Sequence, residues 1–292
     1  MDNAELERLG EIKVDDEISI VAFLDILGFK NHVKNYLNPN YKSDKEILNN
    51  IKSAYENALN SLYASIFEYT GLNIKYKQFS DCTCLSIPNF RGNSRVAAII
   101  LCSFIYVLRE FYFDMFSFDL YIRGGLSFGF HYEDDNMIFS EGLIKAHELE
   151  SKAIYPRIIL DNDITERFKK CWIHHKDTIS LLGCDKILIL DEDGTVFINP
   201  FNLSHALTNM ILEGHTKKPS MYDENKDLKT NITQIDYNTQ IRILKNLESN
   251  IQKLKSDKSN VNILKKYIWL KELVKWNIEP KSSRIKFEYL LK

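Results

Sequence analysis

The chain has 292 residues, 45% of them apolar, and its 38 basic and 40 acidic side chains leave a formal net charge of −2. That length allows a sizeable core in one large domain, or in one domain with an appendage, and the balanced charge argues against a nucleic-acid partner. No apolar run reaches the roughly 18 residues that a membrane span needs, and the acidic N-terminus has no signal core. We therefore expect a cytoplasmic protein without membrane insertion.

In chain order, the first half predicts a central strand, a short helix, a long amphipathic helix, a hairpin of two short strands and a strongly apolar helix. Their ranges are 18–26, 32–37, 44–69, 72–79 with 82–88, and 95–113. The strands are rich in β-branched and apolar residues, whereas the helices repeat apolar residues at three- to four-residue spacing. Ser80 and Asp81 form the tight turn of the hairpin.

The second half adds a strand with three glycines, a helix, a strand entered through proline and a second hairpin, over 120–130, 141–153, 155–161 and 185–200. The glycines admit close approach of another backbone or of a ligand. Two amphipathic helices at 232–254 and 260–276 predict a helical hairpin. The polar stretch at 214–231 precedes them, and we expect it to be a mobile loop.

This order predicts an α+β fold, with one mostly antiparallel sheet, helices packed on one face and a C-terminal helical hairpin. We place the main domain at 1–200 and the helical extension at 201–292. The apolar side of the hairpin must cover either its own sheet or a second copy of the chain, and the sequence pattern favours neither.

The five cysteines form no C-x-x-C pair. Cys82 and Cys84 alternate along a predicted strand, so they point to one face of it. This usage indicates reduced thiols in the core rather than a metal or redox site.

Asp25 is an acidic residue inside an otherwise apolar strand, where an unpaired carboxylate costs several kcal/mol. The residues after it, 26–29, form a turn whose backbone N–H groups attract phosphate oxygens. Asp81 lies at the tip of the neighbouring hairpin. Two carboxylates converging beside an anion-binding turn suit Mg²⁺ or Mn²⁺ carrying a triphosphate. The alternative is that Asp25 caps the following helix and Asp81 is a turn residue.

Four segments, "FLDILGF", "KQFSD", "YIRGGLSFG" and "EGLIKAHELE", resemble the class III nucleotidyl cyclase catalytic domain in order and spacing, from about residue 18 to 160. The resemblance implies that Asp25 and Asp81 hold two metal ions, with the Ile26 carbonyl as a further ligand. It also implies that Ile26, Leu27, Gly28 and Phe29 bind the substrate. The ribose 3′-oxygen would attack the α-phosphorus and pyrophosphate would leave.

The base-reading half of the family pattern is different in this chain. Lys77 aligns with the lysine that reads the purine in adenylyl cyclases, but its usual aspartate or cysteine partner aligns with Met137. The asparagine and arginine that steady the transition state align with Ile144 and Glu148. Methionine offers no strong hydrogen bond to a base, and a glutamate repels a triphosphate.

The combination is similar to the divergent pyrimidine cyclases of the bacterial Pycsar antiphage system, which make cyclic CMP or cyclic UMP. The resemblance therefore implies a pyrimidine cyclase in antiphage signalling, with a base pocket near Tyr76, Phe79 and Met137. Replacement cations could come from three residues, each of which could instead form a surface or structural salt bridge: Arg123, Lys145 and Arg157.

Sites in this family lie between two catalytic domains, so a chain with one such domain implies a head-to-tail homodimer with shared active sites. The carboxylates of one protomer would then face Arg123 and residues 141–150 of the other. Two alternatives to pyrimidine cyclisation stay open: an adenylyl or guanylyl cyclase, and a non-catalytic nucleotide-binding scaffold.

Overall fold

A computed structural model describes residues 13–37, 48–57, 59, 74–91, 94–181, 184, 187–201, 228–255, 261–279 and 285–286. The predicted long helix at 44–69 is described, and helical, at 48–57 and 59. Most of the predicted mobile loop, 214–227, lies outside the described residues.

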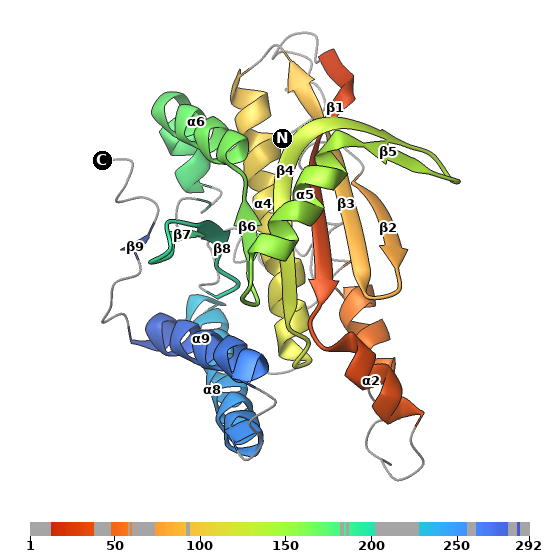
Figure 1. Cartoon of the computed structure of the whole chain (residues 1–292). Helices are drawn as coiled ribbons and strands as arrows, with labels where there is room; N and C mark the ends of the chain where they lie inside the picture. The colour runs from red at the N-terminus through yellow and green to blue at the C-terminus, as the bar shows by residue number, and fades with distance from the viewer. Residues whose placement is uncertain are drawn as a thin grey trace.

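A nine-stranded sheet is the centre of the molecule (Figure 1). Its order is β2-β3-β1-β4-β6-β8-β7-β9, and β5 pairs with β4. All pairs are antiparallel except β4 with β6. The strands are β1 (Lys13–Ile26), β2 (Lys75–Phe79), β3 (Cys82–Arg91), β4 (Ile122–Glu133), β5 (Ile138–Ser140), β6 (Ile158–Leu160), β7 (Leu188–Leu190), β8 (Val196–Ile198) and β9 (Ile285–Lys286).

The labelled helices are α2 (Phe29–Tyr36), α4 (Ser94–Ser117), α5 (Glu141–Lys152), α6 (Asn162–Leu181), α8 (Leu228–Lys255) and α9 (Val261–Ile278). The predicted α+β class, the mostly antiparallel sheet and the C-terminal helical pair are confirmed. The helices divide between the two faces of the sheet, however, because α5 crosses the face opposite α4 (Figure 1).

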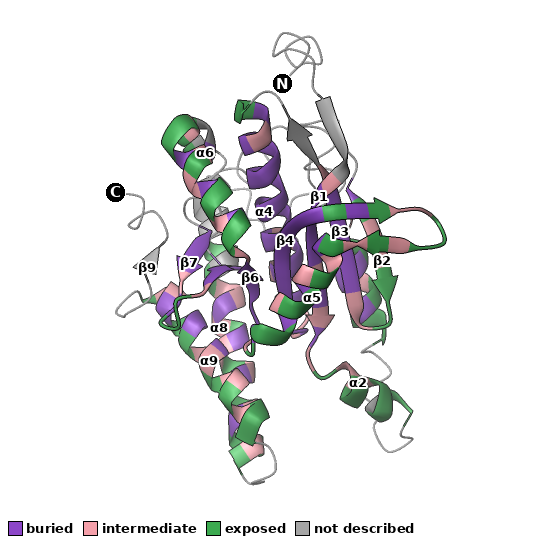
Figure 2. Ribbon diagram, turned by 45° about the horizontal axis from the view of Figure 1, so that its top comes forward, coloured by how far each residue is buried: buried purple, intermediate pink, exposed green. Residues whose placement is uncertain are grey.

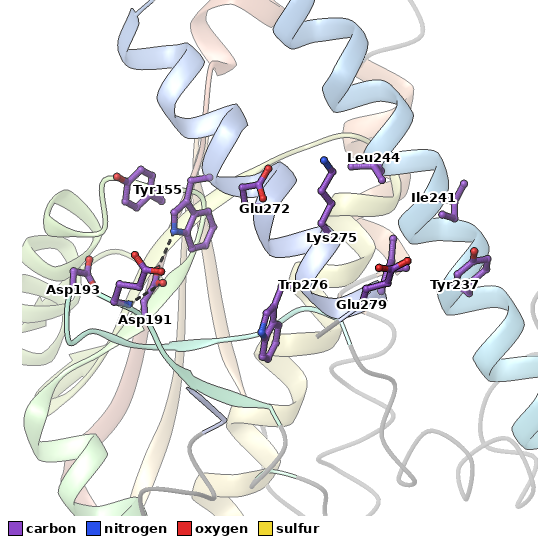
Figure 3. A pocket seen from close by; sticks show the side chains of 13 residues that line it. Tyr155, Asp191, Asp193, Tyr237, Ile241, Leu244, Glu272, Lys275, Trp276 and Glu279 are labelled. Atoms are coloured by element: carbon purple, nitrogen blue, oxygen red, sulfur yellow. Dashed lines mark hydrogen bonds between the residues drawn. The ribbon is translucent and has the colours of Figure 1, made fainter. Parts of the chain in front are cut away.

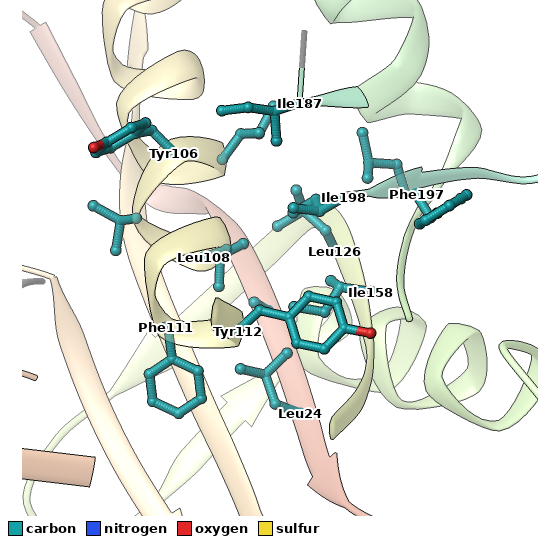
Figure 4. Close-up of a cluster of buried hydrophobic side chains, with 14 of the residues drawn as sticks. Leu24, Tyr106, Leu108, Phe111, Tyr112, Leu126, Ile158, Ile187, Phe197 and Ile198 are labelled. Carbon is teal, nitrogen blue, oxygen red and sulfur yellow. The ribbon is translucent and has the colours of Figure 1, made fainter. Parts of the chain in front are cut away.

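Helix α4 forms the core on one face of the sheet. Its side chains Tyr106, Phe111 and Tyr112 pack with Leu24 of β1 and Leu126 of β4 (Figure 4). Among the described residues α4 is the one helix long and apolar enough to span a membrane, and most of it is buried inside the protein (Figure 2). Its apolar character is therefore satisfied by packing.

Helix α5 packs tightly on the other face because glycines of β4 leave room for its backbone. A Cβ at Gly125 would overlap the carbonyl oxygen of Ala146, and Ser127 Oγ donates to the Gly142 carbonyl at 2.6 Å. His147 packs edge-on against Phe23 of β1. The prediction that these glycines admit another backbone is confirmed.

The β4–β5 hairpin extends over β3 and β2 on the α5 side of the sheet. Glu133 joins the two parts, since its carboxylate accepts from Ser86 Oγ at 3.3 Å and its carbonyl accepts from Lys75 Nζ at 3.3 Å. The β2–β3 edge is thus tied to the hairpin.

The C-terminal helical hairpin packs on its own domain. Asn246 of α8 donates to Asp119 in the α4–β4 loop at 2.9 Å, and Tyr267 of α9 lies edge-on against Tyr121, with ring centroids 5.5 Å apart. The ring of Trp269 stacks on Tyr155 at 5.1 Å. This answers the question that the sequence pattern left open. The division at residue 200 stays a prediction, although β9 adds a C-terminal strand to the same sheet.

Candidate active site

The side chains of Asp25, Asp81 and Cys82 meet at the end of β1, where their ligand atoms all lie within 4.8 Å of one another. Cross-strand pairing places Asp25 opposite Cys82. The hairpin turn is fixed by Ser80, whose φ of +58° reverses the chain, and by the Asp81 carbonyl, which accepts from Ile26 N at 3.2 Å. The two predicted metal-binding carboxylates are therefore brought together.

A network of charges surrounds Asp25. Arg123 of β4 is its cross-strand neighbour, with Nη2 3.5 Å from Asp25 Oδ2, and Arg123 also forms an ion pair with the buried Glu150 of α5. Burial, followed by the negative charges of Glu150 and Asp81, raises the pKa of Asp25 to about 6, against the opposing charge of Arg123. Two of these three carboxylates, Asp25 and Glu150, thus share one arginine.

A divalent cation suits these donors. Mg²⁺ and Mn²⁺ prefer carboxylate and carbonyl oxygens, which Asp25, Asp81 and the neighbouring Ile26 carbonyl offer. Burial raises the pKa of the Cys82 thiol to about 12, and the nearby carboxylates add to the rise. The thiol therefore stays protonated and is a poor ligand for either ion. A cation here would also relieve the repulsion between the two aspartates.

The turn after Asp25 opens into a helix N-terminus. Leu27 N donates to the Tyr121 carbonyl at 2.8 Å, so this predicted phosphate donor is already used by the fold. Gly28 has φ +83°, and its carbonyl accepts from Asn31 N at 2.8 Å. Helix α2 begins at Phe29, and the first N–H groups of a helix have no partner within it. The start of α2 can therefore receive a phosphate oxygen.

The predicted base-reading residues lie apart from the carboxylates. Lys77 donates to the Asp134 carbonyl in the β4–β5 turn, and the same turn holds Met137, whose N–H donates to Asp134 Oδ1 at 2.8 Å. Tyr76 points to the other face of β2, because neighbouring residues of a strand alternate. The expectation of one pocket containing Tyr76, Phe79 and Met137 is wrong within one chain, since Phe79 and Met137 are also half exposed.

Two of the three predicted replacement cations do not reach Asp25. Lys145 pairs with Glu141 at 2.9 Å, one turn away on α5. Arg157 is buried in ion pairs with Asp191, at 2.7 Å, and Asp193. Both form the structural salt bridges named as the alternative. Arg123 does reach the site, but it contacts Asp25 of its own chain, which corrects the expectation that it faces a partner's carboxylates.

Sequence reasoning missed three residues near Asp25. Cys82 was interpreted as a core thiol, and Glu150 and Lys266 were not singled out. Lys266 comes from α9 and lies within electrostatic reach of Asp25, Glu150 and Arg123. Only for Cys82 did the sequence hold a signal, its position directly after Asp81.

Two cavities lie outside this network. One of about 900 Å³ lies between the 191–193 turn and the C-terminal hairpin, where Trp269 Nε1 donates to Asp191 Oδ2 at 3.0 Å (Figure 3). A second, of about 400 Å³, lies between α2, residues 48–57 and β2. The first shares no residue with the charge network, whereas Phe29 and Ser80, which line the second, adjoin Gly28 and Asp81.

No family model matches the chain, and no curated protein does. Among solved structures, a bacterial light-regulated adenylyl cyclase is similar to it, with a TM-score of 0.34 and 13% sequence identity. The likeness covers 54% of this chain and 46% of that one, so the chain spans less than half the length of that protein.

Proposed function

We propose that the chain is a nucleotide cyclase that converts CTP or UTP to the 3′,5′-cyclic nucleotide and pyrophosphate. The observation that supports this most is the convergence of Asp25 and Asp81 at the end of β1, beside the N-terminus of α2. Carboxylates placed next to an anion-binding turn match a metal–triphosphate substrate.

In this proposal Asp25 and Asp81 hold the ions, and the start of α2 binds phosphate oxygens. Two bound Mg²⁺ or Mn²⁺ ions would lower the pKa of the ribose 3′-hydroxyl and neutralise the negative charge of the triphosphate. The ribose 3′-hydroxyl would lose its proton to water, its oxygen would attack the α-phosphorus, and the bond from that phosphorus to the bridging oxygen would break so that pyrophosphate leaves. Arg123 offsets part of the carboxylate charge while Asp25 is free of metal.

The choice of a pyrimidine rests on the resemblance and on Met137. This residue occupies the position of the purine-reading partner and lies in the same turn that Lys77 contacts. Lys77 can donate to O2 of either cytosine or uracil, whereas the thioether of Met137 gives no strong hydrogen bond to a purine amine. The role in antiphage signalling rests on the resemblance to Pycsar cyclases alone.

We further propose a head-to-tail homodimer in which two sites are shared. The β4–β5 hairpin and α5 expose an apolar surface, here called the hairpin surface, which consists of Phe130, Tyr132, Met137, Phe139 and Ile144. Lys77 lies under the same hairpin, away from Asp25 of its own chain. A second copy would cover the hairpin surface and bring its carboxylates to Lys77.

The decisive experiment is incubation of the purified protein with each of the four nucleoside triphosphates and Mn²⁺, followed by mass spectrometry of the products. We expect cyclic CMP or cyclic UMP as the main product, and none from the Asp81→Asn protein, which keeps the shape of the turn but loses the charge. A cyclic purine as main product would identify an adenylyl or guanylyl cyclase. No product from any triphosphate would favour a nucleotide-binding scaffold, the alternative that Ile144 and Glu148 support.

A further inference from the structure

Helix α9 is packed against the segment that holds the candidate site in place. The ring of Tyr267 lies edge-on against Tyr121, and the Tyr121 carbonyl accepts the hydrogen bond from Leu27 in the turn after Asp25. Arg123 follows Tyr121 by two residues, at the start of β4. Lys266 precedes Tyr267 on this helix and lies within electrostatic reach of Arg123, Asp25 and Glu150.

The Lys266 side chain is partly buried and makes no hydrogen bond or ion pair with any residue that the structure describes. Its charged neighbours are Arg123, which repels it, and Asp25 and Glu150, which attract it from beyond ion-pair distance. Burial, together with the charge of Arg123, lowers the pKa of the Lys266 ammonium. Lys266 is thus held beside another cation without a direct counter-ion among the described residues, an arrangement that an incoming anion would stabilise.

The three cations that the sequence suggested for the substrate phosphates are already paired. Arg123 contacts Asp25 and Glu150, Lys145 contacts Glu141, and Arg157 is buried with two aspartates. Helix α5 carries Ile144 and Glu148 where a transition-state asparagine and arginine would be expected. Of these four cations, Lys266 alone has no partner among the described residues.

We propose that Lys266 is a phosphate-binding residue, through which the C-terminal hairpin supplies a cation to the site of its own chain. The ligand group is the chain of phosphates of the nucleotide substrate and of the pyrophosphate product. This identification of the ligand rests on the proposed function. The long side chain of lysine lets the ammonium reach a phosphate oxygen while its methylenes stay packed.

Pyrophosphate binding tests this proposal without turnover. Titration calorimetry compares the wild-type protein with Lys266→Met, which keeps the apolar stem and removes the charge, and with Lys266→Arg, which keeps the charge. Lys265→Met is the matched control, because Lys265 is the exposed neighbour on the same helix. One lost charge-assisted hydrogen bond weakens binding about tenfold. We expect that loss for Lys266→Met, a change within about threefold for Lys266→Arg, and none for Lys265→Met.

Fluorescence of Trp269, one turn further along α9, reports whether each variant keeps the helix docked on Tyr155. Wild-type affinity in Lys266→Met, or equal losses in Lys266→Met and Lys265→Met, would overturn the inference even if the protein made a cyclic nucleotide. The two proposals can also fail separately. If Lys266→Met alone weakened pyrophosphate binding, but the wild-type protein cyclised no nucleotide, the phosphate site would be supported and the proposed cyclase activity contradicted.

Discussion

Arg123 Nη2 lies 3.5 Å from Asp25 Oδ2 of the same chain, because the two residues are cross-strand neighbours on β4 and β1. Family resemblance predicts that Arg123 serves the carboxylates of a partner. The pairing instead means that one protomer contributes Asp25, Asp81 and Arg123 together to any site shared by two protomers. Cations that act across the proposed dimer must come from elsewhere.

This cis contact predicts the result of a mixing experiment. Each shared site would combine Asp25, Asp81 and Arg123 of one protomer with residues of the other. In a mixed dimer of Asp25→Ala and Arg123→Ala proteins, each of the two sites therefore lacks one of these three groups. We expect the mixture to stay inactive after the subunits have exchanged, as followed with two affinity tags. Recovery of up to about half of the wild-type activity would show that Arg123 acts across the interface.

The raised pKa of Asp25 predicts that the metal-free protein gains stability when this charge is removed. In the unfolded chain the carboxyl titrates near its ordinary value of 3.8, whereas in the folded protein its pKa is about 6. The folded state therefore binds more protons between about pH 4 and pH 6, and its stability falls as the pH rises through that window. With EDTA at about pH 8, we expect Asp25→Asn to raise the free energy of unfolding by about 2 kcal/mol.

Denaturant unfolding at about pH 4 and pH 8 measures this gain, which should shrink at the lower pH because the wild-type Asp25 is then protonated. Glu148→Gln is a matched control, since it removes an exposed carboxylate from the adjoining helix. An Asp25→Asn protein no more stable than wild type at the higher pH would contradict the burial and repulsion assigned to Asp25.

The same pKa predicts how Mn²⁺ binding depends on pH. A carboxylate must lose its proton to bind a cation, so the rise in melting temperature caused by Mn²⁺ should be small at about pH 5 and reach its full size above about pH 7. Scanning fluorimetry across this range measures it. Asp81→Ala should abolish the Mn²⁺ effect at every pH, while Cys82→Ser should retain it. Loss of the effect in Cys82→Ser would instead identify the thiol as a ligand.

The sequence predicts many of the elements in their order because each of these carries a local pattern, but it misses helix α6 and the short strands β5 and β9. The strand containing Asp25, the tight turn at Ser80 and Asp81, and the apolar helix that became α4 all follow from alternation, turn residues or helical spacing. The convergence of Asp25 and Asp81 is also predictable, because a hairpin that pairs beside β1 brings its tip to the end of that strand.

Relationships between distant segments could not be predicted in this way. Glu150 reaches Arg123 because α5 crosses the face of the sheet opposite α4, and no local pattern specifies which face a helix covers. Lys266 reaches the site through the docking of α9 on Tyr121. Ile263 and Ile268 stand at helical spacing in α9, and spacing alone would predict that they are packed, yet the structure exposes both and buries other residues of α9.

The close packing of α5 on β4 predicts a large effect from adding one methyl group. In Gly125→Ala the new Cβ would overlap the Ala146 carbonyl and the Leu149 side chain, so α5 must move and carry Glu150 away from Arg123. We expect a loss of about 3 kcal/mol of stability together with most of the activity. Denaturant unfolding and the cyclase assay measure these two effects.

Gly194→Ala serves as the control for this prediction. Gly194 has a φ of +80° in the β7–β8 turn and open space around its Cβ position. Alanine there costs about 1 kcal/mol of backbone strain and should leave the activity unchanged. A Gly125→Ala protein as stable and active as Gly194→Ala would show that α5 does not pack on β4 in this way.

The proposed dimer predicts that a charge on the hairpin surface separates the subunits. Phe139 is 65% exposed and lies edge-on against Phe130, so Phe139→Asp should leave the folded monomer intact while placing a desolvated carboxylate in the interface. Light scattering should show a shift from dimer to monomer, and activity should fall with it because each site needs both protomers.

Ile173→Asp is the matched control, since Ile173 on α6 is 72% exposed and lies outside the hairpin surface. A wild-type protein that is monomeric during turnover, or a Phe139→Asp protein that is an active dimer, would contradict this architecture.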